Sequence, residues 1–288
     1  MKHKQGFYDL CVTPTSTSSL VSILTTLVEL GYRTVAINQI VEESALVQEK
    51  NKKKRKAENN VNPNPSIPPP MKLDDIPEVL RSSIQILQRI TISFSTSDNA
   101  HKMISSENIK KYDIIAVIPT SKAALMHTCN TLDVDIISFD TSIKMPVQWN
   151  RKLYNLAAEK GMWFELPYGL GVLDSTARRN LIQAGHSYHA IGKSKNILIS
   201  SGAQNPMQIR GPYDVINLSL LLGLSEEQAK SAITNAGRAV TLRAESRRRG
   251  KAVVCIEKIV SNQLEVVDEE DNSDNTILPA CKKKKTLG

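Results

Sequence analysis

A chain of 288 residues with 41% apolar residues can bury a large core, either as two modest domains or as one barrel-sized domain. It has no apolar run near the roughly 20 residues that span a bilayer, and its start lacks the apolar stretch of a signal peptide, so we expect a soluble, unsecreted protein without membrane contact. The net charge is +8, but the runs "KKKRK" (52–56) and "KKKK" (282–285) carry nine positive charges and leave the remaining chain at −1. A polyanionic partner would therefore bind a local patch.

The N-terminal part predicts one strand–helix–strand unit. "FYDLCV" (7–12) has the pattern of a buried strand, and 18–31 has the apolar spacing of an amphipathic helix that stops at Gly31. A second strand follows at 34–41. The Val- and Ile-rich strands favour a parallel sheet that is covered on both faces.

Residues 42–80 interrupt this alternation. A Lys/Glu/Asn run is followed by "NPNPSIPPP", a composition that buries too little apolar surface to order itself. We interpret 42–80 as a disordered, solvent-exposed loop inserted in the fold, because the same alternation of strands and helices resumes after it.

The rest of the chain continues as strands and helices in turn. About seven strands in this alternation favour a TIM-like (β/α) barrel, eight-fold or with an incomplete strand count, and a doubly wound open sheet is the alternative. We predict one barrel domain over 1–263 and a disordered acidic and then basic tail over 264–288. The later predicted segments are strands at 84–94, 113–120, 135–140, 162–168 and 196–201, and helices at 121–133, 151–161, 175–191, 212–223 and 225–240.

The predicted strand ends offer little catalytic chemistry. None of the five histidines falls at a strand end, and the four cysteines form no C-x-x-C pair, so neither a metal site nor a disulfide framework is expected. No G-x-S-x-G, G-x-G-x-x-G or P-loop motif is present, so no catalytic residue and no cofactor is predicted. The polar residues at strand ends are Asp9, Cys11, Asn38, Gln39, Asp140, Glu165, Ser200, Ser201 and Gln204.

The order of these segments resembles a known family. "YDLCV", "VAINQI", "YDIIAVIP", "LDVDIISFD", "FELPY", "DSTARRN" and "NILISSGAQNPMQIRGPYDVINLSLLLGLS" together resemble the barrel-shaped protein subunit of eukaryotic and archaeal ribonuclease P and ribonuclease MRP, over about residues 6–245. The resemblance implies a non-catalytic RNA-binding subunit of a nuclear and nucleolar ribonucleoprotein. In that particle RNA cleaves the 5′ leader of precursor tRNA, and the MRP particle acts on precursor rRNA. It also implies two kinds of partner: the catalytic RNAs, and other protein subunits that include a small α/β protein.

A more distant resemblance connects the first and last motifs to the polymerase-and-histidinol-phosphatase metallophosphoesterases. Those enzymes carry D-L-H-x-H, Asp-His and S-D-A-H patterns, whereas this chain has "DLCVT" from Asp9, "NQ" at Asn38 and "SGAQ" from Ser201. The metal-binding histidines are missing. A metal-dependent phosphoesterase and a barrel that binds only proteins remain the alternatives.

Several basic residues are candidate RNA contacts. Arg210 precedes the helix-opening pair Gly211–Pro212, so its charge is unfavourable there unless it meets an anion, either an RNA phosphate or the carboxylate of Asp214. The run "RRRGK" (247–251) is predicted to follow the last helix and is a candidate for phosphate contact. The two lysine-rich runs are candidates for nuclear import. The predicted RNA-binding residues are Arg210, Arg178, Arg179, Lys193, Lys195, Lys110 and Lys111.

Overall fold

Seven parallel strands form the centre of the molecule, in a computed structural model that describes residues 6–43 and 67–250. Each strand pairs with the next one along the chain, so the sheet order follows the sequence. The strands are β1 (Phe7–Val12), β2 (Tyr32–Glu42), β3 (Gln85–Phe94), β4 (Ile114–Pro119), β5 (Ile136–Ile137), β6 (Trp163–Pro167) and β7 (Ile197–Ser200).

The first and last strands meet and nearly close the sheet into a barrel. Val12 forms a parallel bridge with Ala203, just after β7. The amide of Thr13 donates to the Ala203 carbonyl at 2.8 Å, and the amide of Gly202 donates to the Cys11 carbonyl at 2.8 Å. In an open sheet β1 and β7 would lie at opposite edges, so the predicted barrel is confirmed.

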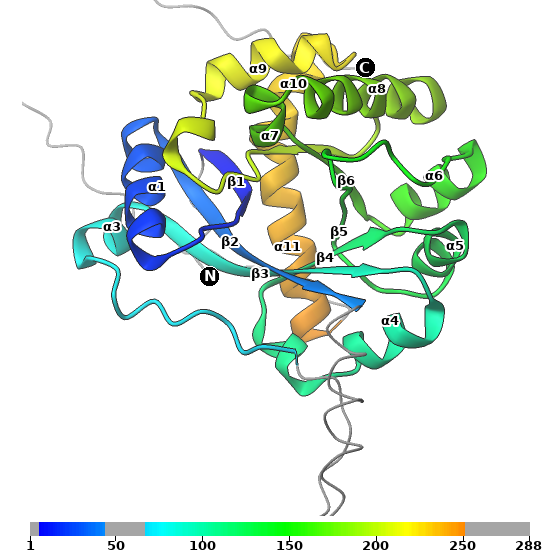
Figure 1. Ribbon diagram of the computed structural model, residues 1–288, viewed down its shortest axis with the longest axis horizontal. Helices are drawn as coiled ribbons and strands as arrows, with labels where there is room; N and C mark the ends of the chain where they lie inside the picture. Colours follow the sequence, from blue (N-terminus) through cyan, green and yellow to red (C-terminus); the bar gives the residue numbers. More distant parts are fainter. Residues whose placement is uncertain (1–5, 44–66, 251–288) are drawn as a thin grey trace, which may run out of the picture. The chain divides into compact units, whose positions relative to one another are not determined.

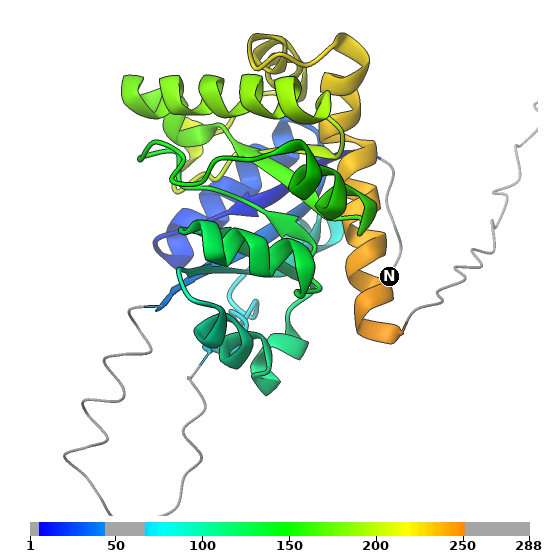
Figure 2. The same cartoon turned by 90° about the vertical axis from the view of Figure 1, so that its right-hand side faces the viewer.

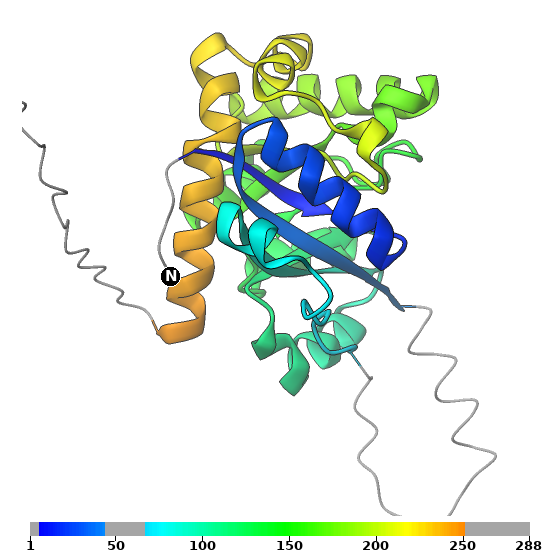
Figure 3. The same ribbon diagram turned by 90° about the vertical axis from the view of Figure 1, so that its left-hand side faces the viewer.

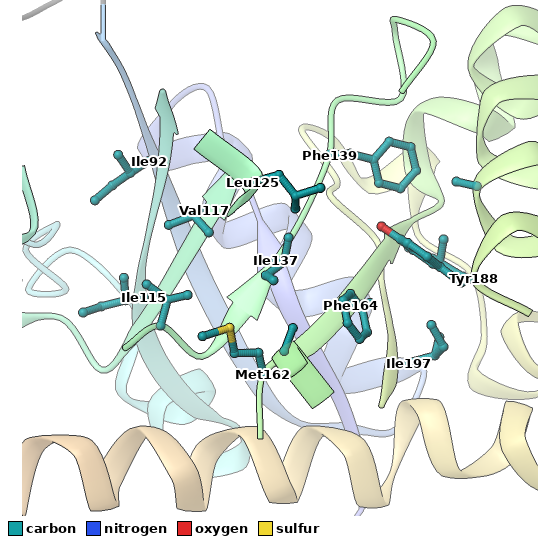
Figure 4. Close-up of a cluster of buried hydrophobic side chains, with 14 of the residues drawn as sticks. Ile92, Ile115, Val117, Leu125, Ile137, Phe139, Met162, Phe164, Tyr188 and Ile197 are labelled. Atoms are coloured by element: carbon teal, nitrogen blue, oxygen red, sulfur yellow. The ribbon is translucent and has the colours of Figure 1, made fainter. Parts of the chain in front are cut away.

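Helices surround the strands, with α1 and α3 on one side and α4, α5 and α6 on the other (Figure 1). The core lies between the strands and this outer layer, and Figure 4 shows part of it. The helices are α1 (Thr17–Glu29), α3 (Glu78–Ser83), α4 (Ser97–Ile104), α5 (Lys122–Asn130), α6 (Arg151–Glu159), α7 (Gly169–Leu173), α8 (Ser175–Gly192), α9 (Pro212–Leu221), α10 (Glu226–Ile233) and α11 (Asn235–Arg249), with 3₁₀ turns η1 (Glu107–Lys111) and η2 (Pro206–Gln208).

The last helix closes the N-terminal end of the barrel. Ala236, Val240 and Ala244 of α11 pack into the same cluster as Tyr8 of β1 and Ile114 of β4. Figures 2 and 3 show α11 lying across one end of the strands. A Cβ atom at Gly237 would overlap the Cβ of Tyr8, so the close approach of α11 to β1 requires glycine.

The chain bends at Thr234, where the sequence predicted one helix over 225–240. Ser225 and Gln228 form the expected capping box of α10, but Thr234 has φ −119° and ψ −79°, and α11 then continues to Arg249. The three arginines of "RRRGK" therefore lie inside the last helix rather than beyond it. Arg247 donates to the buried carboxylate of Asp135 at 2.9 Å, so it stabilises the barrel end.

The described part of the predicted loop is anchored to the barrel by a few contacts. Ile67 and Ile76 are buried, the Asn108 side chain donates to the Ile67 carbonyl at 2.7 Å, and the Tyr112 hydroxyl donates to the Pro68 carbonyl at 2.9 Å. Residues 67–80 are thus held against the barrel at these points, while other side chains of the segment, such as Val79, remain exposed. The runs 52–56 and 282–285 and the tail 264–288 lie outside the described residues.

In the described part of the chain, no helix has the length and apolar character needed to cross a membrane.

Candidate functional site

A buried ion pair joins the middle of β3 to the middle of β6 inside the barrel. The Arg89 guanidinium of β3 donates to both carboxylate oxygens of Glu165 on β6, at 2.5 Å and 2.6 Å, and the two side chains are 1% and 0% exposed. Arg89 also donates to the Leu10 carbonyl at 2.7 Å and to the Thr91 hydroxyl at 3.2 Å. This bidentate geometry fixes the guanidinium in place.

The pair keeps both groups charged although both side chains are almost fully buried. Burial by itself would raise the pKa of Glu165, but attraction to the Arg89 guanidinium and hydrogen bonds, one from Ser200 at 2.7 Å, hold that pKa below its usual value. Burial by itself would lower the pKa of Arg89, and the surrounding anionic groups outweigh it and raise that pKa. The barrel centre therefore contains a resident cation that belongs to the chain itself.

Asp9 and Cys11 form the seam between β1 and β7. Asp9 Oδ1 accepts from the amides of Ser201 at 3.0 Å and Cys11 at 3.3 Å, and Oδ2 has no hydrogen-bond partner within residues 6–43 and 67–250. Burial raises the pKa of Asp9 to about 6 and that of the Cys11 thiol to about 12. Cys11 is therefore a neutral thiol, and Asp9 orders backbone amides.

The other predicted strand-end residues do not converge on a metal either. Asn38 accepts from the Thr91 hydroxyl at 2.6 Å, Gln39 accepts from the Tyr112 hydroxyl, and exposed Asp140 accepts from the Ser142 amide. Among the residues that the structure describes, no three His, Cys, Asp or Glu side chains are grouped so that they could hold a metal ion. A metal at the barrel centre would have to displace the Arg89 guanidinium.

Three of the predicted RNA-binding arginines lie around α7. Arg178 donates from Nε to the Gly171 carbonyl at 2.9 Å and from Nη2 to the Val172 carbonyl at 3.1 Å, while the main-chain amide of Arg210 donates to the Tyr168 hydroxyl at 3.1 Å. Arg179 is the exposed neighbour of Arg178 at the start of α8. The geometry thus groups these arginines around one short helix.

The Arg210 side chain lies on carbonyl groups rather than on a carboxylate. Its Nη1 donates to the carbonyls of Met207 and Ile209, both at 2.8 Å. Within the described residues Arg210 has no ion pair with Asp214, whose carboxylate instead lies near Gly211 at the start of α9. The repulsion expected between Arg210 and the helix start is therefore offset by the two carbonyls, and its other nitrogens are left for an outside anion.

The predicted lysines lie elsewhere on the molecule. Lys193 ends α8 in a left-handed conformation and Lys195 follows it, whereas Arg178 lies in the first turn of the same helix, so about 22 Å of helix separates Arg178 from Lys193. Lys110 and Lys111 belong to η1, which precedes β4. The structure therefore does not bring all seven predicted residues into one surface region.

Sequence reasoning did not find two features of this region. Arg89 is the one charged residue in β3, and that isolated charge in an apolar strand was a signal that could have revealed it. Nine large apolar side chains are exposed in the described residues, and five of them lie on α7, η2 or α9. We call these five the α9 apolar surface: Leu173, Met207, Tyr213, Leu220 and Leu221.

Comparisons with known proteins agree on one family. The model of the family described as RNase P subunit p30 matches residues 6–249. The chain is 34% identical to the mouse "Ribonuclease P protein subunit p30" over 94% of each protein, and 30% identical to the "Probable ribonuclease P protein subunit 3" of Schizosaccharomyces pombe, over 80% of this chain and 88% of that protein. It is 26% identical to the Saccharomyces cerevisiae "Ribonuclease P/MRP protein subunit RPP1", over 85% and 79%. A chain in a cryo-EM structure of archaeal ribonuclease P with mature tRNA shares the fold with a TM-score of 0.59 and 16% identity, over 88% of this chain and 99% of that one.

Proposed function

This chain belongs to the ribonuclease P subunit p30 family, and we propose that it acts as a non-catalytic RNA-binding subunit of a nuclear ribonucleoprotein. In this role the RNA of the ribonuclease P particle cleaves precursor tRNA, and the RNA of the related MRP particle acts on precursor rRNA. The protein neutralises and positions these RNAs.

The ion pair of Arg89 and Glu165 is the observation that supports a non-catalytic role. A metallophosphoesterase needs a cluster of ligands that hold divalent ions and activate water. Here the buried carboxylate of Glu165 is neutralised by a guanidinium. We expect no hydrolysis of RNA or of a generic phosphodiester by the pure chain in Mn²⁺, and metal-dependent cleavage that Asp9→Asn abolishes would restore the phosphoesterase alternative.

RNA contact is proposed for the arginines around α7. Arg179 and Arg210 have no ion pair within the described residues, and a guanidinium with free N–H groups matches the oxygens of a phosphate. Lys193 and Lys195, and separately Lys110 and Lys111, are proposed as further contacts to more distant parts of the same RNA. A large RNA can touch all of these positions at once, although they do not form one patch.

Salt-dependent binding tests this surface. With the RNA of the particle, Arg210→Ala should weaken binding and lower the slope of log K against log salt by about one unit, because one phosphate contact is lost. Arg151→Ala is the matched control, since Arg151 is an exposed arginine at the start of α6. An unchanged slope in the first variant would remove Arg210 from the interface, and no salt dependence in the unaltered protein would favour the barrel that binds only proteins.

Protein partners are proposed to cover the α9 apolar surface. Tyr213 is 72% exposed and Leu221 is 63% exposed, and large exposed apolar side chains on neighbouring elements are typical of protein interfaces. We propose that another protein subunit of the particle docks there, with the small α/β protein among the candidates. Leu221→Glu should release that subunit and leave the RNA salt slope unchanged, and retention of the subunit would contradict the assignment.

Nuclear and nucleolar location is proposed from the two basic runs, which lie outside the described residues. Deleting 52–56 together with 282–285 should reduce nuclear accumulation of a fluorescent fusion, with the melting temperature unchanged because charged runs add nothing to a core. Accumulation at the normal level after both deletions would show that the protein enters with a partner instead.

A further inference from the structure

The mouth of the barrel contains a cavity that the proposed RNA-binding role does not use. Its volume is about 490 Å³, within the range of sites for small molecules. All seven strands or the loops after them contribute to its wall, and the long segment from Ser138 to Trp149 covers one side. The cavity therefore lies where the carboxyl ends of parallel strands meet, which is the place where barrels of this kind bind ligands.

The floor of this cavity offers hydrogen-bond donors that are held in place. Asn38, 4% exposed, is fixed by the Thr91 hydroxyl, which donates to its Oδ1 at 2.6 Å, and its Nδ2 has one long contact, to Thr13 at 3.5 Å. The contacts of Arg89 with Leu10, Thr91 and Glu165 use all but one of its N–H groups, and that last one is on Nη2. Buried donors with spare capacity recognise a ligand that brings an acceptor such as a carbonyl oxygen.

The walls are mainly apolar and partly aromatic. Phe139 and Tyr188, drawn in Figure 4, and Trp149 line the cavity together with Ile118 and Leu170. Trp149 packs edge-on against Phe164 and Tyr188, with ring centroids 5.1 Å and 6.1 Å away, so its ring is held rigidly. Rigid aromatic walls favour a flat ring in the ligand.

Charge at the cavity excludes anions. In the described residues its lining has one basic side chain, Arg89, which Glu165 already neutralises, and the exposed carboxylate of Asp140 also lines it. The described lining therefore offers a phosphate or a carboxylate, including the RNA backbone, no uncompensated positive charge. The spare donors of Asn38 and Arg89 disfavour a cation, so the ligand that matches both the donors and the charge of the lining is an uncharged one with an acceptor oxygen.

We propose that the barrel mouth is a binding site for a small, uncharged ring compound that presents a carbonyl oxygen to Asn38 and Arg89. Benzamide is a simple probe of this class, and benzoate is the matched anion of the same shape. The chain has two tryptophans, so the Trp163→Phe protein leaves Trp149 in the cavity as the reporter. Benzamide should change its fluorescence saturably, with a Kd in about the millimolar range for a ligand of this size, and benzoate should bind about tenfold more weakly.

Two variants locate the binding. In the Trp163→Phe protein, Asn38→Leu should weaken benzamide binding about tenfold because the donor is lost. Asp140→Lys, a change at an exposed position, should leave the fold intact and strengthen benzoate relative to benzamide because the charge at the cavity is reversed. Arg210→Ala, outside the cavity, should change neither affinity.

Several results would overturn the proposal. These are no saturable response to benzamide, equal affinities for benzamide and benzoate, or a folded Asn38→Leu variant that binds benzamide as before. If Asn38→Leu fails to fold, an Asp140→Lys protein with an unchanged ratio of the two affinities also refutes the site. None of these measurements involves RNA, so their outcome is independent of the RNA-binding role.

Discussion

Replacing Asp9 by Asn should remove a pH-dependent cost of folding. Burial raises the pKa of Asp9 from 3.8 to about 6, so the folded state binds the proton more tightly than the unfolded state does. The stability that this proton contributes is present below pH 4 and is lost as the pH rises through 6. At pH 7.5 the ionised group costs up to about 3 kcal/mol relative to its neutral form.

Asparagine keeps the part of Asp9 that matters for the seam. Its Oδ1 can still accept from the amides of Ser201 and Cys11, and it has no charge to bury. Its Nδ2 replaces Oδ2, which has no hydrogen-bond partner in the described residues. The effect of this replacement on the free energy of unfolding does not vary with pH. The free energy of unfolding of Asp9→Asn relative to the unaltered protein should therefore rise by about 2 kcal/mol between pH 4.5 and pH 7.5.

Urea unfolding of both proteins at several pH values measures this difference directly. Comparing the two proteins at each pH cancels the titration of every other group that the substitution does not touch. A difference that stays constant from pH 4.5 to pH 7.5 would refute the reasoning, because Asp9 would then ionise at its ordinary pKa in the fold.

Three further substitutions test other parts of the structure. Glu165→Gln should lower the free energy of unfolding by about 3–5 kcal/mol in urea at pH 7.5, because Arg89 becomes an uncompensated buried charge, and a loss below about 1 kcal/mol would contradict the buried pair. Arg210→Ala should cost about 1–2 kcal/mol in the same assay through two lost hydrogen bonds, whereas unchanged or raised stability would mean that repulsion from the α9 start dominates. Gly237→Ala should cost about 1–3 kcal/mol and lower the melting temperature, because its Cβ would overlap Tyr8, and an unaffected melting temperature would show that α11 can move away.

The sequence by itself determined the order of the strands and most of the outer helices. β1 and α8 lie where the local patterns predicted them, since alternation, apolar spacing and capping residues are properties of short segments. The boundary between α10 and α11 was missed because the bend at Thr234 has no local stop residue of the Gly or Pro kind. The long motif after β7 also indicated the family, and it did so by its order of residues rather than by any physical property.

Only the tertiary structure decided what occupies the barrel centre and where the charges lie. Arg89 and Glu165 are 76 residues apart, so no local pattern could pair them, and their attraction acts only once β3 and β6 lie on opposite sides of one barrel. The position of Arg210 beside α7 likewise depends on tertiary packing, because its amide donates to the hydroxyl of Tyr168, 42 residues away in the chain. Local patterns act over a few residues, whereas the burial that turns Arg89 into a resident cation depends on all seven strands at once.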